Sequence, residues 1–220
     1  MIVAEVAPLE TLADLMEQLG NVPLSRVRLR PFPGTATVDD VLRLCDHEPK
    51  HLCELVDGVL VEKAMGHEES RLAARLLFVL QLYLEEHDLG IIAGADGPHQ
   101  ILYDQVRFPD VAFIAYEKIP EGANPKSAVP NWVPTLAVEI LSSSNTKKEM
   151  SRKLRDYFEA GVELVWYVDP PTRTVRVFHS PSDFVTLTDQ DELTGEEILP
   201  GFRLAIGDWF DRSLRIRPKA

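Results

Sequence analysis

Two short apolar stretches, each interrupted by one acidic residue, constrain the fold of this chain most strongly. They are residues 108–114, with the sequence FPDVAFI, and residues 136–141, with the sequence LAVEIL. Both are too short for a typical helix and too evenly apolar for a strand with one solvated face, so they predict interior strands of a covered sheet. An ionised carboxylate on such a strand is costly unless it is paired, protonated or bound to a metal. Asp110 and Glu139 therefore suggest one shared site for a hard cation.

The composition limits the class of protein. The chain has 220 residues, of which 45% are hydrophobic, and its formal net charge is -12. This length can bury the core of one domain, and the negative charge argues against broad, non-specific binding of nucleic acid. The two cysteines give no disulfide framework, the N-terminus shows no signal-peptide pattern, and no apolar run has membrane-spanning length. We therefore expect a cytoplasmic protein without membrane contact.

The order of the motifs divides the chain into three parts. We expect an N-terminal extension over residues 1–36, a main domain over residues 37–211 and a basic C-terminal tail over residues 212–220. The cations of the tail are Arg212, Arg215, Arg217 and Lys219.

Three arginines in the extension alternate with apolar residues. Arg26, Arg28 and Arg30 flank Val27 and Leu29, a spacing that predicts an extended segment with three cations on one face. A solvated strand edge protected by its charge is the favoured interpretation, and a strip facing phosphate groups is the alternative.

Several strands are expected before the first acidic stretch. Residues 53–62 predict a β-hairpin, because a two-residue Asp-Gly turn separates two apolar runs. Glu54 then lies on the first strand of this hairpin and is a third acid of interest. Residues 91–93 and 100–103 predict a further pair of strands.

Two helices complete the pattern. Residues 67–87 carry one long apolar stripe, and residues 148–160 carry a second, which Gly161 closes. In the second helix, Lys153 borders the apolar stripe and can point back towards the sheet. Between Lys147 and Arg155 there are five cations and one acid, a local excess of positive charge in an acidic chain.

A zinc site has to be considered where cysteine and histidine residues lie close together. Cys45, His47, His51 and Cys53 fall within nine positions of the sequence. The usual Cys-x-x-Cys pairs are absent, and a helix end and Pro49 separate the two halves, so a metal site here is disfavoured.

The motifs follow one another in an order that resembles a nuclease family. The segments that carry the resemblance are Glu54 to Gly58, Arg107 to Val111, Pro134 to Ser142, Lys153 with Tyr157, and Trp166 to Asp169. Together they resemble the Uma-two family of restriction endonucleases, in the PD-(D/E)XK superfamily, over roughly residues 37–210. The resemblance implies an α/β (α+β) fold with a restriction-endonuclease-like core, in which a central mixed sheet is flanked by helices, after an N-terminal extension.

The resemblance also implies a metal centre. Asp110 and Glu139 would bind the catalytic magnesium, with manganese as a substitute, and the Ile140 carbonyl would be a further ligand. Magnesium suits oxygen-rich sites of this kind. It would acidify the attacking water and offset the charge that builds on the scissile phosphate.

One position departs from the superfamily pattern. Leu141 stands where a lysine is expected two residues after the acid, and Lys153 matches the relocated lysine of the family. Lys153 would orient the water or stabilise the phosphate, while Glu54 would complete the metal shell or orient Lys153. Glu149 stands where the family more often has Asp, and Ser143 where Pro is common.

Taken singly, each acid or lysine has a structural explanation. Asp110 could belong to a strand-entry turn, Glu139 to a buried ion pair with an arginine, and Lys153 to the solvated surface. Their joint occurrence in family order favours a magnesium-dependent endonuclease that hydrolyses DNA phosphodiester bonds. The alternative is a catalytically inactive module of the same fold that binds nucleic acid or a protein partner. A homodimer is left open.

Overall fold

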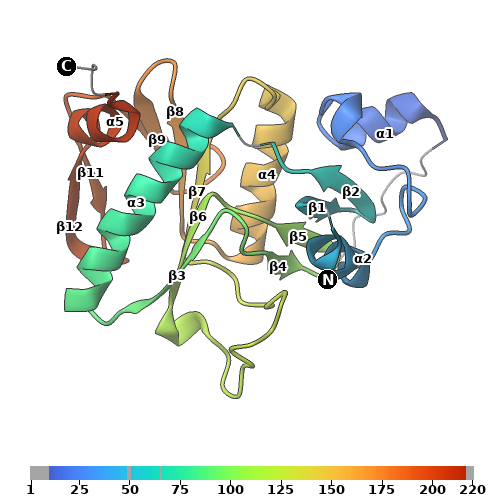
Figure 1. Cartoon of the computed structure of the whole chain (residues 1–220), viewed down its shortest axis with the longest axis horizontal. Coiled ribbons are helices and arrows are strands. Elements are labelled where there is room, and N and C mark those ends of the chain that lie inside the picture. The colour runs from blue at the N-terminus through green and yellow to red at the C-terminus, as the bar shows by residue number, and fades with distance from the viewer. Residues whose placement is uncertain (1–9, 49–50, 65, 217–220) are drawn as a thin grey trace.

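A six-stranded sheet forms the centre of the molecule (Figure 1). The computed structural model describes residues 10–48, 51–64 and 66–216. The strand order is β10-β9-β8-β7-β6-β3, with β7 and β8 parallel and the other neighbours antiparallel. The strands are β3 (Gly90–Gly94), β6 (Val111–Ala115), β7 (Leu136–Ile140), β8 (Leu164–Asp169), β9 (Thr174–Phe178) and β10 (Phe184–Leu187).

The two acidic stretches form neighbouring interior strands, as predicted. β6 pairs antiparallel with β7, and Val111 lies opposite Val138. Every residue of β7 is buried, and so are the first four of β6. The continuous apolar runs thus correspond to strands covered on both faces.

A second sheet has the order β2-β1-β5-β4. It consists of β1 (Cys53–Val56), β2 (Val59–Glu62), β4 (His99–Leu102) and β5 (Gln105–Arg107). β1 and β2 form the predicted hairpin, with Asp57 and Gly58 both at positive φ, as its tight turn requires.

The predicted pairing of residues 91–93 with residues 100–103 is wrong. β3 pairs with β6 in the central sheet, whereas β4 pairs with β5 in the second sheet. The shorter connection from β4 to β5, with Leu102 opposite Gln105, offers a tighter hairpin than the one we expected.

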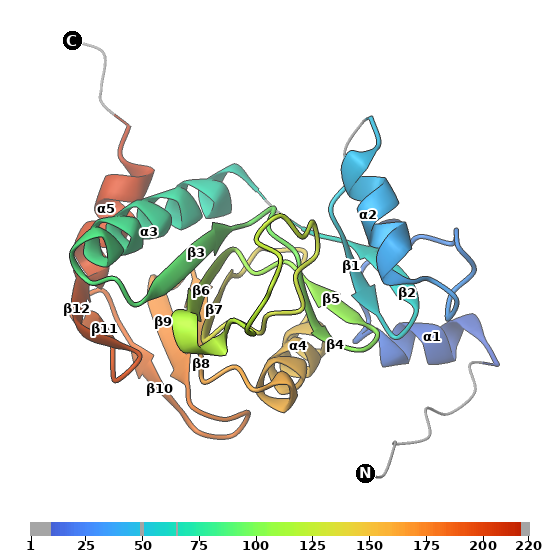
Figure 2. The same cartoon turned by 90° about the horizontal axis from the view of Figure 1, so that it is seen from below.

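Helices cover both faces of the central sheet. Figure 2 shows α3 (His67–Glu86) and α5 (Ile206–Leu214) on one side of it and α4 (Lys147–Ala160) on the other. On the side of α3 and α5, Leu72, Leu76 and Leu80 of α3 pack against the sheet. The hairpin of β11 (Glu192–Gly195) and β12 (Leu199–Ala205) packs on the same side. α5 continues to Leu214, three residues beyond the main domain we expected, and Arg217 and Lys219 of the expected tail lie outside the described residues.

The local sequence explains the position of α4. Thr146 and Glu149 form a reciprocal capping box at its start, and Gly161 ends it in the left-handed conformation with φ 96°. Met150, Leu154 and Tyr157 pack onto the sheet. Lys153 follows the same side of the helix, so only 5% of its surface is exposed.

The described part of the N-terminal extension packs on the hairpin of β1 and β2. It contains α1 (Leu12–Gln18) and a short 3-10 helix, η1 (Leu24–Arg26), and α2 (Val38–Asp46) follows it. Apolar residues of the extension bury themselves against the hairpin, whereas residues 1–9 lie outside the described part of the chain. The remaining element is η2 (Tyr116–Lys118). Within the described residues, no helix combines the length and apolarity needed to cross a membrane.

Candidate functional site

Four elements bring the predicted site residues together beside the two sheets. Glu54 lies on β1, Asp110 directly before β6, Glu139 on β7 and Lys153 on α4. Lys153 Nζ is 2.7 Å from Glu139 Oε1 and 2.8 Å from Glu54 Oε1. This confirms the expected approach of the lysine to the acids. At least 95% of the surface of each of these residues is buried, so they form one internal polar cluster.

The two acids of the central sheet are fixed by its backbone. The Asp110 amide donates to the Val138 carbonyl at 2.9 Å, which extends the pairing of β6 and β7 by one residue. The Ile140 amide donates to Asp110 Oδ2 at 2.7 Å. The carboxylate of Asp110 therefore lies across from the end of β7 that carries Glu139.

A second lysine, Lys63, belongs to the site and was not predicted. Lys63 Nζ is 2.9 Å from Asp110 Oδ1 and donates to the carbonyls of Phe108 at 2.5 Å and Ala95 at 3.1 Å. The hairpin contained a signal for it. Val61 pairs with Glu54, so strand alternation places residue 63 on the same face as that acid.

Arg107 is a further buried cation that the sequence reasoning left without a role. Its guanidinium is 2.9 Å from Glu54 Oε2 and also pairs with Asp156 of α4. Burial alone would raise the pKa of Glu54, but the charges of Lys153 and Arg107 outweigh it and lower the pKa to about 2. Glu54 is therefore an ionised anchor between two cations.

Glu139 has a different environment from Glu54. Burial raises its pKa and the charge of Asp110 adds to that effect, while Lys153 opposes both. Tyr157 donates its hydroxyl to Glu139 Oε1 at 2.5 Å, and burial next to this carboxylate keeps the pKa of Tyr157 well above its ordinary value. Burial disfavours the charge on Lys153, but Glu139 and Glu54 outweigh this and raise its pKa, so Lys153 is a cation.

The donor set of the two sheet acids suits a hard cation. Asp110 and Glu139 offer only oxygen ligands, and their mutual repulsion adds to burial in raising the pKa of Glu139. Glu139 Oε1 is held by Tyr157 and Lys153, whereas its second oxygen accepts no hydrogen bond from the described residues. A divalent cation between the acids would relieve the repulsion, so these residues fit a hard divalent cation. The Ile140 carbonyl as a ligand stays a prediction.

Clusters of three ligands are absent from the described part of the chain. Within residues 10–48, 51–64 and 66–216, no three His, Cys, Asp or Glu side chains are grouped so that they could hold a metal ion. Glu54 contacts Lys153 and Arg107, and its place in a metal shell stays a prediction. At the disfavoured zinc position, Cys53 is fully buried, and burial raises the pKa of its thiol to about 12.

The predicted row of arginines in the extension is wrong in its first part. Residues 24–26 form η1, and Val27 makes only an isolated bridge to β2. The physical reason is that Arg26 turns inwards and pairs with both oxygens of Glu149, at 2.8 and 3.1 Å. Arg28 pairs with Glu62 at 2.5 Å, and Arg30 is exposed. The three cations therefore do not form one strip.

Comparisons with known proteins agree on the fold. A family model described as "Putative restriction endonuclease" (Uma2) matches residues 38–207. A crystal structure of a putative nuclease belonging to DUF820 from Anabaena variabilis ATCC 29413 aligns with a TM-score of 0.67 at 19% identity, over 81% of this chain and 99% of that chain. A search of curated proteins finds no match. The expected family and the expected fold, a central mixed sheet flanked by helices, are confirmed.

Proposed function

The chain belongs to the Uma2 (putative restriction endonuclease) family, and from this membership we propose that it is a magnesium-dependent endonuclease, a hydrolase of DNA phosphodiester bonds. One observation carries the proposal: the Lys153 ammonium lies 2.7 Å from Glu139 and 2.8 Å from Glu54. A cation fixed beside Glu139, one of the two acids that suit a metal, is the arrangement that phosphoryl transfer needs. Manganese would substitute for magnesium, the cytoplasm is the proposed location, and a homodimer stays open.

The proposed roles follow from the contacts. Asp110 and Glu139 would hold the magnesium ion, which supplies a Lewis acid that polarises the phosphate and lowers the pKa of water. Lys153 would hold positive charge at the phosphate oxygens, where negative charge increases during the reaction. Glu54 would keep Lys153 in place, because it is itself fixed by Arg107 at 2.9 Å. Tyr157 would orient Glu139 through the hydrogen bond at 2.5 Å.

A plasmid cleavage assay tests this function. Purified protein is incubated with supercoiled plasmid in magnesium, in manganese and in a chelator. We expect nicked or linear DNA with either metal and none with the chelator. Lys153→Met should lower the rate by about 10²-fold or more, since it removes the charge that stabilises the transition state. Lys126→Met, an exposed change outside the cluster, is the matched control. Intact plasmid under all metal conditions would refute the proposal.

A second candidate is a non-catalytic module that binds nucleic acid or a protein. The observation in its favour is Leu141 at the position where the superfamily has its lysine. In addition, Glu54, Asp110 and Glu139 are each already paired with a lysine of the chain. DNA binding without cleavage in either metal would select this module over the endonuclease.

A further inference from the structure

A basic groove lies between α4 and the N-terminal extension. None of its cations belongs to the internal polar cluster of Glu54, Asp110, Glu139 and Lys153. The groove has a volume of about 350 Å³ and is lined by four cations, Lys147, Lys148, Arg152 and Arg155, with Glu17 as its one acid. This concentration of positive charge stands out in a chain with a net charge of -12.

Two cations of the groove are available to a ligand. Lys147 and Arg155 are exposed and form no ion pair with any described residue. Lys148 makes only a loose contact of 3.6 Å with Glu17, and both side chains are more than half exposed. Arg152, in contrast, is committed to the protein through Asp57 at 2.6 Å. An anion in the groove would therefore meet cations that the fold itself does not use.

The wall formed by the extension is held rigidly. The Thr146 hydroxyl donates to the Gly20 carbonyl at 2.5 Å, and Arg152 donates to the Gln18 carbonyl. Gly20 has φ 77°, and a Cβ atom on it would lie 2.5 Å from the Glu149 nitrogen, so only glycine permits this approach. The groove is thus preformed. The wall formed by the extension lies outside residues 38–207, the part that matches the family model.

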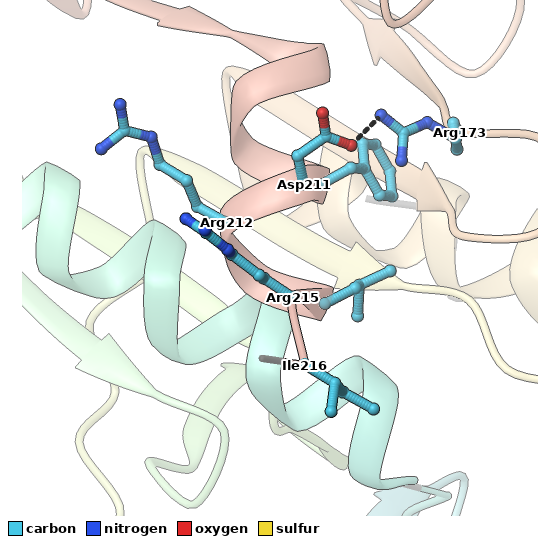
Figure 3. A pocket seen from close by; sticks show the side chains of 7 residues that line it. Arg173, Asp211, Arg212, Arg215 and Ile216 are labelled. Carbon is cyan, nitrogen blue, oxygen red and sulfur yellow. Dashed lines mark hydrogen bonds and ion pairs between the residues drawn. The ribbon is translucent and has the colours of Figure 1, made fainter. Parts of the chain in front are cut away.

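A second basic cavity provides a comparison at the other end of the molecule. It has a volume of about 530 Å³ and lies on α5, at the opposite end of the long axis from α1 (Figure 1). Figure 3 shows Arg173 pointing to Asp211 on one side of α5, while Arg212 and Arg215 both extend to the other side. Arg173 is neutralised by Asp189 at 3.1 Å and by Asp211 at 2.9 Å. This cavity therefore has less charge to offer than the groove on α4.

We propose that the groove between α1 and α4 binds the phosphate backbone of DNA, next to the cluster that would cleave it. The proposal rests on the proposed function for its choice of polyanion. Lys153 lies on the same helix as the groove cations, and a helix with its side chains is only about 10 Å wide. Lys147 also begins the helix, where the backbone amides favour negative charge. Arg152 lines both the groove and a small cavity that Glu54 also lines, so a bound strand would run close to the acids.

Binding of a fluorescent DNA duplex, measured by anisotropy in a chelator, tests the groove without cleavage. Lys147→Gln with Arg155→Gln should raise Kd by about 10-fold or more in 0.1 M salt and reduce the slope of log K against log salt by about two, one for each lost phosphate contact. Arg212→Gln with Arg215→Gln, on α5 and directly after it, removes the same charge and should leave both quantities close to those of the unmodified protein. Thermal melts check that both variants fold.

The outcomes separate this inference from the proposed function. If DNA binding weakens equally in both double variants, or is absent in the unmodified protein, the groove is not the DNA-binding site. If binding depends on the groove but the protein cuts no plasmid, the binding site is supported and the endonuclease activity is refuted. If the protein cuts plasmid and the α4 variant binds DNA unchanged, only the binding site is refuted.

Discussion

Lys63 Nζ lies 2.9 Å from Asp110 Oδ1, while the other oxygen of Asp110 accepts from the Ile140 amide at 2.7 Å. Both oxygens of a proposed metal ligand are therefore already engaged by the protein. The lysine also donates to the carbonyls of Phe108 and Ala95, so it has other acceptors if a metal takes the carboxylate oxygen. Lys63 thus acts as an internal counter-ion to Asp110.

Lys63→Met should make stability depend more strongly on metal. Without the ammonium, the Asp110 charge is left close to Glu139, so the metal-free protein should melt at a lower temperature. Magnesium should recover more of the stability than it adds to the unmodified protein, because it no longer competes with Lys63. Thermal unfolding across a magnesium titration measures this, with Lys126→Met as control. Equal shifts in both proteins would contradict the counter-ion role.

Asp110→Asn should abolish stabilisation by metal. In the unmodified protein, millimolar magnesium or manganese should raise the melting temperature, since it binds the folded state and relieves the repulsion between the acids. Asparagine removes one of the two charges and so most of the cation's binding energy. Calorimetric or fluorescence melts with and without manganese measure the difference. A melting curve of the unmodified protein that manganese leaves unchanged would count against a cation site.

Glu139→Gln should fold at least as well as the unmodified protein and lose cleavage. The folded state raises the pKa of Glu139 above its ordinary value of 4.5, so its ionisation costs stability as pH rises from 4.5 through the folded pKa. Glutamine removes this cost, and Lys153 keeps Glu54 at 2.8 Å. Urea unfolding at pH 5 and pH 8 should show an advantage of the variant that grows with pH. A loss of about 3 kcal/mol or more would instead indicate a structural ion pair.

Glu54→Gln should have the opposite effect on stability. The folded pKa of Glu54 is about 2, below its ordinary value of 4.5, so its contribution to stability is complete above pH 4.5 and is lost as pH falls towards 2. The substitution leaves Arg107 and Lys153 short of a buried partner and should cost about 3 to 5 kcal/mol at pH 7. Urea unfolding should show that the difference in free energy of unfolding between the variant and the unmodified protein is smaller at pH 3 than at pH 7. Glu159→Gln, an exposed change, is the control. A difference that stays the same at both pH values would exclude the ion-pair explanation.

Much of the fold was accessible from the sequence because local patterns determined it. The two apolar stretches, the Asp-Gly hairpin and the capped helix α4 are each specified by residues close together in the chain. The pairing of β3 and β4 was mistaken because the choice between two possible partners depends on the whole sheet.

The site was predictable in part for the same reason. The position of Lys153 beside the acids followed from helix spacing. Lys63 and Arg107 were missed because a single charged residue at a strand end usually faces solvent, and nothing local marks it as buried. Their partners lie 47 and 53 positions away in the sequence, so only the folded arrangement identifies them.

Arg26 connects the two segments that carry Lys63 and Lys153. Its Nε donates to the carbonyl of Glu62, one residue before Lys63, at 2.7 Å. Its guanidinium pairs with Glu149, which lies on the same helix as Lys153. A fragment cut to residues 38–207 would retain every predicted active-site side chain and lose this tie. The part of the chain that supports the site is therefore longer than the part that matches the family. Experiments on a fragment chosen by sequence similarity alone would report on a site that lacks this support.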